Sequence, residues 1–235
     1  MLYLPRNNNN KLLLIAVFCA FASVTAAAQD LSVEDSYLQK SVESMIISEQ
    51  AKSGDRENKY AALQYIRQAI DSGQLTDDVQ EILSYMALEG ILNKVRVEGR
   101  TFNNYPDVRM KAVEYLGDLK GQAASAALIR VLLVENEPHI AAEAVRSLTK
   151  HGFGENSYAL DVILYVFRKY DSKIPSNVLA ISVIDSCLAF TEGGGAKNPW
   201  VYSTLLHISK NPSYVRPVRE HAGETLGKVY AKNGS

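Results

Sequence analysis

Two ten-residue phrases of this chain are near copies of each other. Residues 108–117 read VRMKAVEYLG and residues 218–227 read VREHAGETLG, so both follow the pattern V-R-x-x-A-x-E-x-L-G. The Val, Ala and Leu positions are four residues apart and fall on one stripe of an α-helix. The alanines, Ala112 and Ala222, would let a neighbouring helix approach closely. The repetition therefore predicts two copies of one helical unit within a longer array.

The arginine and the glycine near the two ends of the phrase give two further expectations. Arg109 and Arg219 fall in the first turn of their helices, where the helix dipole disfavours a cation, so each needs an acceptor in an adjoining unit. Gly117 is expected to help end its helix, whereas Gly227 precedes Lys-Val-Tyr and is expected inside one. A fainter copy of the pattern lies upstream, in Lys59, Ala62 and Ile66.

Most of the chain beyond Asp30 has a helical rhythm. Apolar residues recur at three- and four-residue steps, and turn residues divide them into segments of about a dozen. The last three expected helices cover roughly residues 176–190, 200–209 and 215–230. No convincing alternating strand pattern is found. We therefore expect an all-α fold of about ten helices.

The prolines give this array its period. Pro106, Pro138, Pro175 and Pro212 each stand near the start of a helical segment, where a missing N–H group costs little. Two helices lie between one of these prolines and the next. A repeating unit of about 35–40 residues made of two helices is what α-solenoids stack. The sequence thus predicts an α-solenoid of stacked antiparallel helical pairs.

Three successive segments carry a resemblance to a known family. PDVRMKAVEYLG, QAASAALIRVLLVE and PHIAAEAVRSL resemble HEAT repeats, including the short HEAT-like type also found in bilin lyases. The resemblance is strongest over residues 105–150 and 212–231. It implies a scaffold or adaptor that binds other proteins through an extended concave face. We assign residues 105–235 to HEAT-like repeats, 93–104 to a linker or loop, and 29–92 to a helical unit of capping or diverged repeats.

Residues 1–28 look like an export signal. Arg6 and Lys11 give a basic start, residues 12–24 are an apolar run, and residues 26–28 are small. The run is too short to favour a membrane span, which needs about 20 apolar residues. The sequence predicts cleavage after residue 28 and a periplasmic protein with no membrane span; secretion, a retained N-terminal anchor and a lipid attached at Cys19 are the alternatives.

Charge and cysteine content exclude other classes. The full chain has a formal charge of −1, and loss of Arg6 and Lys11 with the signal brings it to −3. Without a basic excess, a nucleic-acid binder is not expected. Cys187 would then be the remaining cysteine, so no intramolecular disulfide is expected. Its apolar neighbours in VIDSCLAF favour a buried packing cysteine over a thiol nucleophile.

Candidate protein-binding residues lie on the second helix of each pair, which is expected to line the concave face. The core stripe of residues 158–171 turns Tyr165 and Arg168 outward, and the same reasoning places Arg130 and His207 beside them. Arginine and tyrosine often anchor protein contacts. An ordinary solvated face is the alternative for this strip.

A second candidate is the stretch 93–104, NKVRVEGRTFNN, which interrupts the helical rhythm. It carries Lys94, Arg96 and Arg100 around Val95 and Val97. Long connections in compact arrays often carry function, although a plain linker explains the stretch equally well.

No catalytic, metal or cofactor motif emerges from the sequence. The glycines at 193–195 precede Lys197, but they lack the spacing that wraps a phosphate. The histidines lie in different segments with no metal-ligand spacing, and no carboxylate pair is singled out. We therefore expect a non-catalytic, protein-binding scaffold. The alternatives are an enzyme or enzyme subunit similar to the HEAT-like lyases, with a ligand in the concavity, and a self-assembling part of an envelope machine.

Overall fold

A computed structural model describes residues 33–76, 78–153, 158–195 and 197–234, with side chains from residue 42 to residue 232. The predicted signal segment, residues 1–28, lies outside the described residues. The chain divides into two units, residues 1–42 and residues 43–235. In the first unit, the described part is helical from Val33 onward. Everything below concerns the second unit.

The described residues form ten helices and one short hairpin, which confirms the all-α prediction. The helices are α2 (Val33–Lys52), α3 (Arg56–Ser72), α4 (Val79–Leu88), α5 (Pro106–Asp118), α6 (Gln122–Val134), α7 (Pro138–His151), α8 (Tyr158–Asp171), α9 (Asn177–Glu192), α10 (Pro199–Lys210) and α11 (Arg216–Gly234). The strands are β1 (Arg96–Val97) and β2 (Arg100–Thr101). No described helix is long and apolar enough to cross a membrane.

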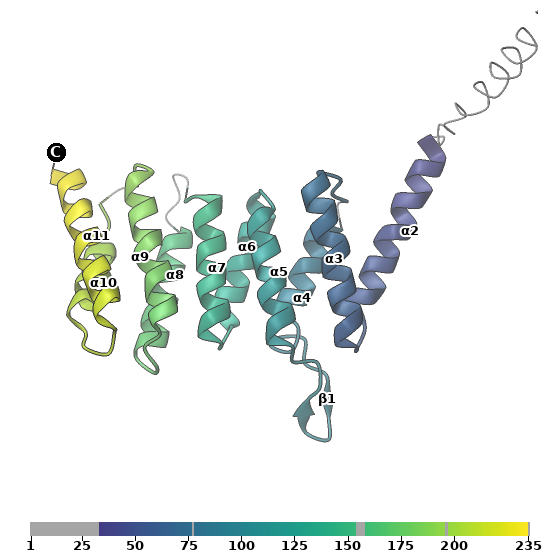
Figure 1. Ribbon diagram of the computed structural model, residues 1–235, viewed down its shortest axis with the longest axis horizontal. Coiled ribbons are helices and arrows are strands. Elements are labelled where there is room, and N and C mark those ends of the chain that lie inside the picture. Colours follow the sequence, from purple (N-terminus) through teal and green to yellow (C-terminus); the bar gives the residue numbers. More distant parts are fainter. Residues whose placement is uncertain (1–32, 77, 154–157, 196, 235) are drawn as a thin grey trace, which may run out of the picture. The chain divides into compact units, whose positions relative to one another are not determined.

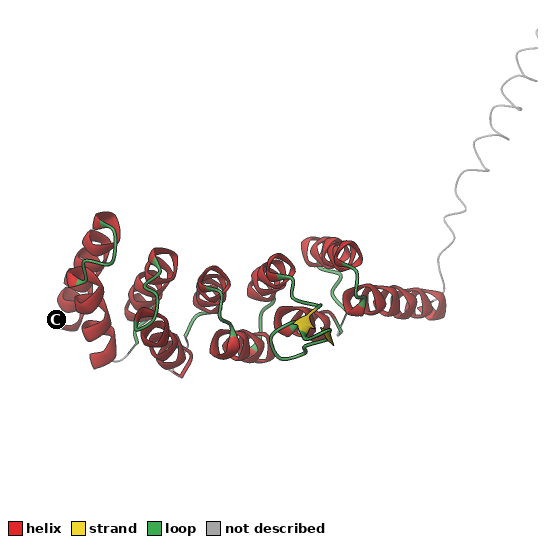
Figure 2. Ribbon diagram, turned by 90° about the horizontal axis from the view of Figure 1, so that it is seen from below, coloured by secondary structure: helices red, strands yellow, loops and turns green. Residues whose placement is uncertain are grey.

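From α3 onward the helices form two rows. Helices α3, α5, α7, α9 and α11 pack side by side as an odd-numbered row, and α4, α6, α8 and α10 form an even-numbered row behind it (Figures 1 and 2). From α5 to α11, neighbours in the odd row pack more closely than neighbours in the even row. Figure 2 shows both rows bending gently, with the odd row on the inner side. This is the repeated helical-pair arrangement that the sequence predicts.

The prolines mark the odd-row helices. Pro106 and Pro138 are the first residues of α5 and α7, and Pro175 and Pro212 lie in the loops just before α9 and α11. A proline in the first turn leaves no hydrogen bond unmade, because the first N–H groups of a helix have no partner within it. The proline spacing therefore reports where each pair begins, as predicted.

The repeated phrase occupies equivalent places in α5 and α11. Ala112 and Ala222 are both fully buried. Leu116 is fully buried as well, whereas Leu226 is only partly buried. The difference arises because α5 is covered by α7, while α11 is the last helix that the structure describes.

Gly117 has a different role from the one that the sequence suggests. The helix continues through it to Asp118, and its backbone does not need the left-handed region. A Cβ atom at this position would lie 2.6 Å from Cβ of Ser147 on α7. Ser147 in turn donates a hydrogen bond to the Val113 carbonyl over 3.2 Å. Gly117 thus permits the close approach of α5 and α7 rather than ending α5.

Two buried ion pairs lie inside the stack. Lys59 is the fourth residue of α3, and its Nζ atom is 2.6 Å from Glu89, which directly follows α4. Arg109 is the fourth residue of α5, and its Nε atom is 3.1 Å from Glu135, which directly follows α6. All four side chains are almost completely buried. The acceptor of Arg109 is therefore a carboxylate, but Glu135 belongs to the same helical pair; the preceding pair supplies the Glu89 carbonyl, at 3.4 Å.

Arg219, the counterpart of Arg109 in α11, differs. Its Nε atom is buried and has no hydrogen-bond partner among the described residues. The expectation of a compensating acceptor is thus met at Arg109 and not at Arg219.

Gly117 and Gly227 hold the same place in the repeated phrase, so substituting each one tests whether α5 and α7 need the glycine for their close approach. We predict that Gly117→Ala lowers the free energy of unfolding by about 1–2 kcal/mol, because overpacking against Ser147 outweighs the gain in helix propensity. Gly227→Ala meets nothing within 4 Å and should raise the free energy of unfolding by about 0.5–1 kcal/mol. Urea unfolding followed by circular dichroism measures both; equal effects would contradict the assigned role of Gly117.

Candidate functional site

A stacked arginine–tryptophan pair marks the exposed face of the even row. The Arg168 guanidinium on α8 lies 4.0 Å from the centre of the Trp200 ring on α10. Both side chains are exposed, and 55% of Trp200 is accessible to solvent. A guanidinium over an indole ring is held by cation–π attraction, and its edge stays free to bind an acceptor. The pair is therefore already assembled on an open surface.

The start of α10 fixes Trp200 in this position. The Asn198 side chain caps the helix by accepting a hydrogen bond from Trp200 N over 2.9 Å, and Pro199 is the first helical residue. Asn198 also donates to Asp161 on α8 over 3.3 Å. A proline and an N-cap asparagine both favour a helix start here. The sequence thus places the tryptophan in the first turn, facing α8.

A shallow hollow of about 300 Å³ runs from the stacked pair along the junction of α8 and α10. Its far end is formed by His207, whose Nε2 atom is 2.7 Å from Asp171 Oδ2. Asp171 also accepts a hydrogen bond from the Tyr214 hydroxyl, which lies just before α11. Burial, together with this hydrogen bond, raises the pKa of Tyr214 above its ordinary value. Asp171 therefore ties α10 and the start of α11 to the end of α8.

The structure brings part of the predicted strip together. Arg168 and His207 line the same hollow, and Tyr165 is 63% exposed, one turn before Arg168 on α8. Arg130 is exposed on α6, but no described contact joins it to the other three. The strip lies on the even row, on the outer side of the gentle bend, and not on the concave side on which it was expected (Figure 2).

Two residues of this surface were missed by sequence reasoning. Trp200 is the one tryptophan of the chain, and its place after Asn-Pro at a helix start was the signal that could have found it. Asp171 had no such signal, because its partners His207 and Tyr214 come from other helical pairs.

The exposed face of the odd row has a different character, because its charges are paired between neighbouring helices. Arg67 on α3 and Lys150 on α7 both bind Asp118 on α5, at 2.6 Å and 3.2 Å. Burial alone would raise the pKa of Asp118, but these hydrogen bonds bring it below its ordinary value. His221 on α11 pairs with Asp185 on α9 over 2.8 Å. These side chains hold the row together and are less available to a partner.

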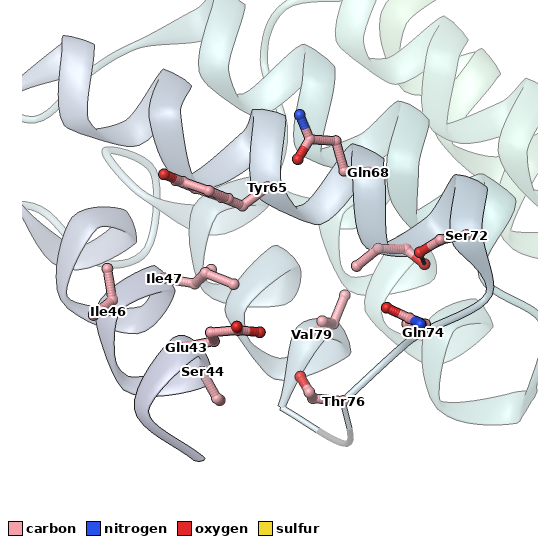
Figure 3. Close-up of a pocket in the computed structure, with 11 residues that line it drawn as sticks. Glu43, Ser44, Ile46, Ile47, Tyr65, Gln68, Ser72, Gln74, Thr76 and Val79 are labelled. Carbon is pink, nitrogen blue, oxygen red and sulfur yellow. Dashed lines mark hydrogen bonds between the residues drawn. The ribbon is translucent and has the colours of Figure 1, made fainter. Parts of the chain in front are cut away.

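Another hollow lies near the start of the second unit, where α2, α3 and α4 meet. It has a volume of about 620 Å³ and is lined by both apolar and polar side chains. Figure 3 shows Ile46 and Ile47 of α2 on one side and Tyr65 of α3 on the other. Glu43 is the carboxylate in the lining, and it already has an interaction partner. The hollow therefore lacks the convergent charged groups that would identify a reactive centre.

The histidines do not assemble a catalytic group. The hydroxyl of Ser203, which also lines the hollow beside His207, donates to the Trp200 carbonyl over 3.1 Å. His151 Nδ1 lies 2.8 Å from Ser125 Oγ, but its buried Nε2 atom has no described partner that could orient it. The described residues contain no cluster of ligands suited to a metal ion. Neither serine–histidine arrangement completes a nucleophile–base–carboxylate series.

The predicted linker, residues 93–104, contains the β1–β2 hairpin. Lys94, Arg96 and Arg100 are all exposed on it, and none forms an ion pair with any residue that the structure describes. Figure 1 shows the hairpin extending beyond the ends of the helices. These three cations are thus free to meet another molecule.

Comparison of the chain with protein-family models, with curated proteins and with solved structures finds no match. The surfaces described above therefore carry the functional inference by themselves.

The reactivity of Cys187 tests whether its thiol is a buried packing group or a nucleophile. The side chain is fully buried on α9, and burial raises its pKa to about 12. At pH 8 the thiolate needed for attack is scarce and unreachable, so we predict that iodoacetamide modifies Cys187 at least about 100-fold more slowly in the native protein than in urea. Mass mapping of the peptide that contains Cys187 measures the rate; similar rates in both conditions would contradict the buried assignment.

Proposed function

We propose that this chain is an exported, non-catalytic protein-binding module that uses the exposed face of its even-numbered row. The observation that carries the proposal is the stacked pair of Arg168 and Trp200, with Tyr165 exposed next to it. Tryptophan, tyrosine and arginine are the side chains that most often dominate binding at protein interfaces. Three of them together on one exposed surface match the anchor cluster of such an interface.

The distribution of paired charges favours this face over the other. On the odd row, Arg67, Lys150 and His221 already have carboxylate partners on neighbouring helices. On the even row, Arg130 and Arg168 form no ion pair with a described residue. A protein partner gains more from an unpaired guanidinium, because no existing ion pair must be broken first.

The hollow between α8 and α10 suits a protein side chain better than a small substrate. At about 300 Å³ it is small and open, and it lies between two exposed aromatic side chains, Trp200 and His207. Small-molecule sites usually enclose most of the ligand surface. A projecting side chain from a partner surface needs only such a shallow recess.

Sequence features support the other parts of the proposal. The repeated phrase, its buried alanines and the paired rows are all consistent with the HEAT-like resemblance, and HEAT-like proteins characteristically bind other proteins. The basic, apolar and small-residue pattern of residues 1–28 supports export, with the periplasm as the proposed compartment.

Site-specific photocrosslinking in the native envelope tests the proposal. A benzoylphenylalanine in place of Tyr165 should yield a discrete adduct with another protein. Adding Arg168→Ala and Trp200→Ala should reduce that adduct about tenfold or more, since each anchor contributes about 1–2 kcal/mol. The matched control places the same group at Lys111, an exposed residue of the odd-row helix α5.

Three outcomes would overturn the proposal. They are the lack of any adduct at Tyr165, an adduct that persists unchanged without Arg168 and Trp200, and the same adduct at Lys111. An adduct of twice the mass of the chain would instead identify self-assembly through this face.

A further inference from the structure

The β1–β2 hairpin has an exposed apolar side. Arg96 pairs with Thr101 and Val97 pairs with Arg100, and Phe102 N donates to the Val95 carbonyl over 2.8 Å. Residues opposite each other in an antiparallel pair share a side, as do residues two apart along a strand. Val95, Val97 and Phe102 therefore lie on one side together with Arg100. Each of these three apolar side chains is more than half exposed.

The other side of the hairpin is turned toward the helices. Lys94, Arg96 and Thr101 lie on it; Lys94 and Thr101 line a small hollow together with Arg109 and Glu135, whereas Arg96 is exposed. The apolar side faces the turn between α2 and α3, since Phe102 is the side chain nearest to an added Cβ atom at Gly54. Phe102 thus lies beside the body at Gly54, yet Val95, Val97 and Phe102 each keep more than half of their area exposed.

The base of the hairpin is anchored more firmly than a linker requires. Asn103 is buried, and its side chain bonds to Val95 N at 2.9 Å, to the Asn93 carbonyl at 2.7 Å and to Glu89 at 3.2 Å. Glu89 is itself held by Lys59. Gly90 has a φ of +76°, and a Cβ atom there would lie 2.6 Å from the Asn103 carbonyl oxygen. The hairpin is therefore set in a fixed direction, which lowers the entropy cost of binding.

The connection itself does not need a hairpin. The next equivalent connection, between α6 and α7, is made by residues 135–137, whereas α4 and α5 are joined by residues 89–105. Since three residues suffice for the same step in the stack, the additional residues serve some purpose other than spanning the distance.

We propose that this hairpin is a docking element for an acidic protein segment that also carries apolar side chains. Lys94, Arg96 and Arg100 are exposed and unpaired among the described residues, so they attract a negatively charged partner. Apolar side chains of the same segment cover Val95, Val97 and Phe102, whose exposed areas are otherwise unfavourable. Charge selects the partner, and apolar burial retains it.

The shape of the hairpin favours a protein segment over an anionic membrane. The turn is formed by Glu98 and Gly99, so a carboxylate stands at the tip. The apolar side chains lie along the flank between the tip and the base. A flat lipid surface that meets the tip contacts Glu98 first and does not reach all three apolar groups at once. An extended chain can approach from the flank and reach all three apolar groups.

This docking element is separate from the even-row face, and it can be tested without knowing the natural partner. The probe is a fluorescein-labelled peptide of alternating glutamate and leucine, titrated with the full chain at low salt and followed by fluorescence anisotropy. A peptide of alternating lysine and leucine serves as the opposite-charge probe. Vesicles of phosphatidylglycerol and phosphatidylcholine in equal parts serve as the membrane probe.

Four double variants separate the contributions. Arg96→Glu with Arg100→Glu should raise the Kd for the acidic peptide about tenfold or more, and Val97→Ser with Phe102→Ser about fivefold. Lys120→Glu with Lys173→Glu removes the same charge from exposed lysines elsewhere and should change Kd by less than about twofold. Arg168→Ala with Trp200→Ala should leave Kd unchanged, even if it abolishes the adduct at Tyr165.

The expected result is binding of the acidic peptide that depends on both hairpin variants. The proposal is overturned if wild type does not bind this peptide, if the lysine peptide binds as well, or if the hairpin charge reversal has no more effect than its control. Vesicle binding that exceeds peptide binding and requires the hairpin would also overturn it, in favour of a membrane surface. Circular dichroism verifies folding, and Arg96→Gln with Arg100→Gln replaces the charge reversal if that variant is unfolded.

Discussion

Two buried ion pairs, Lys59 with Glu89 and Arg109 with Glu135, set the register of the helical pairs on which the rest of the structure depends. A buried charge that loses its partner costs about 3–5 kcal/mol, so packings that separate these residues are excluded. Each cation is the fourth residue of an odd-row helix, and each glutamate directly follows the even-row helix next in the chain. The pairs therefore fasten the end of one helical pair to its beginning. Arg109 also donates to the Glu89 carbonyl, which connects the two pairs to each other and to the base of the hairpin.

The next helical pair, α7 with α8, has no buried ion pair at the equivalent position, and this affects the candidate surface. In α7 the fourth residue is Ala141, which is fully buried and carries no charge. Asp171, at the end of α8, is then available for other partners, and it accepts from His207 and Tyr214. The carboxylate therefore organises the hollow beside Arg168 and Trp200 instead of neutralising a buried cation. Glu89 and Glu135 neutralise buried cations, whereas Asp171 organises the surface beside Arg168 and Trp200. All three carboxylates lie at or just after the end of an even-row helix.

Local sequence patterns predicted the helices well, but they did not predict the contacts between helices. The repeated phrase and the prolines predicted stacked helical pairs, because helix periodicity and proline chemistry act within one segment. The need of Arg109 for an acceptor was also predictable, but Glu135 could not be chosen among many carboxylates. Gly117 was misjudged because its role depends on Ser147, which lies on another helix. The hairpin was missed although Val95 and Val97 alternate with cations before a Glu-Gly turn, since so short an alternation is a weak strand signal.

For the candidate site, exposure of Tyr165 and Arg168 followed from the core stripe, whereas Trp200 and Asp171 join them only through packing of α8 on α10.

A double-mutant cycle on Arg109 and Glu135 tests most directly whether buried ion pairs fasten the stack. Urea unfolding of wild type, Arg109→Met, Glu135→Gln and the double variant gives four free energies of unfolding. Each single substitution should cost about 3–5 kcal/mol, and the double should cost less than their sum by at least about 2 kcal/mol. The exposed pair of Arg216 and Glu220 provides the reference, where coupling should stay below about 1 kcal/mol. Coupling between Arg109 and Glu135 no larger than that of the exposed pair would contradict the account.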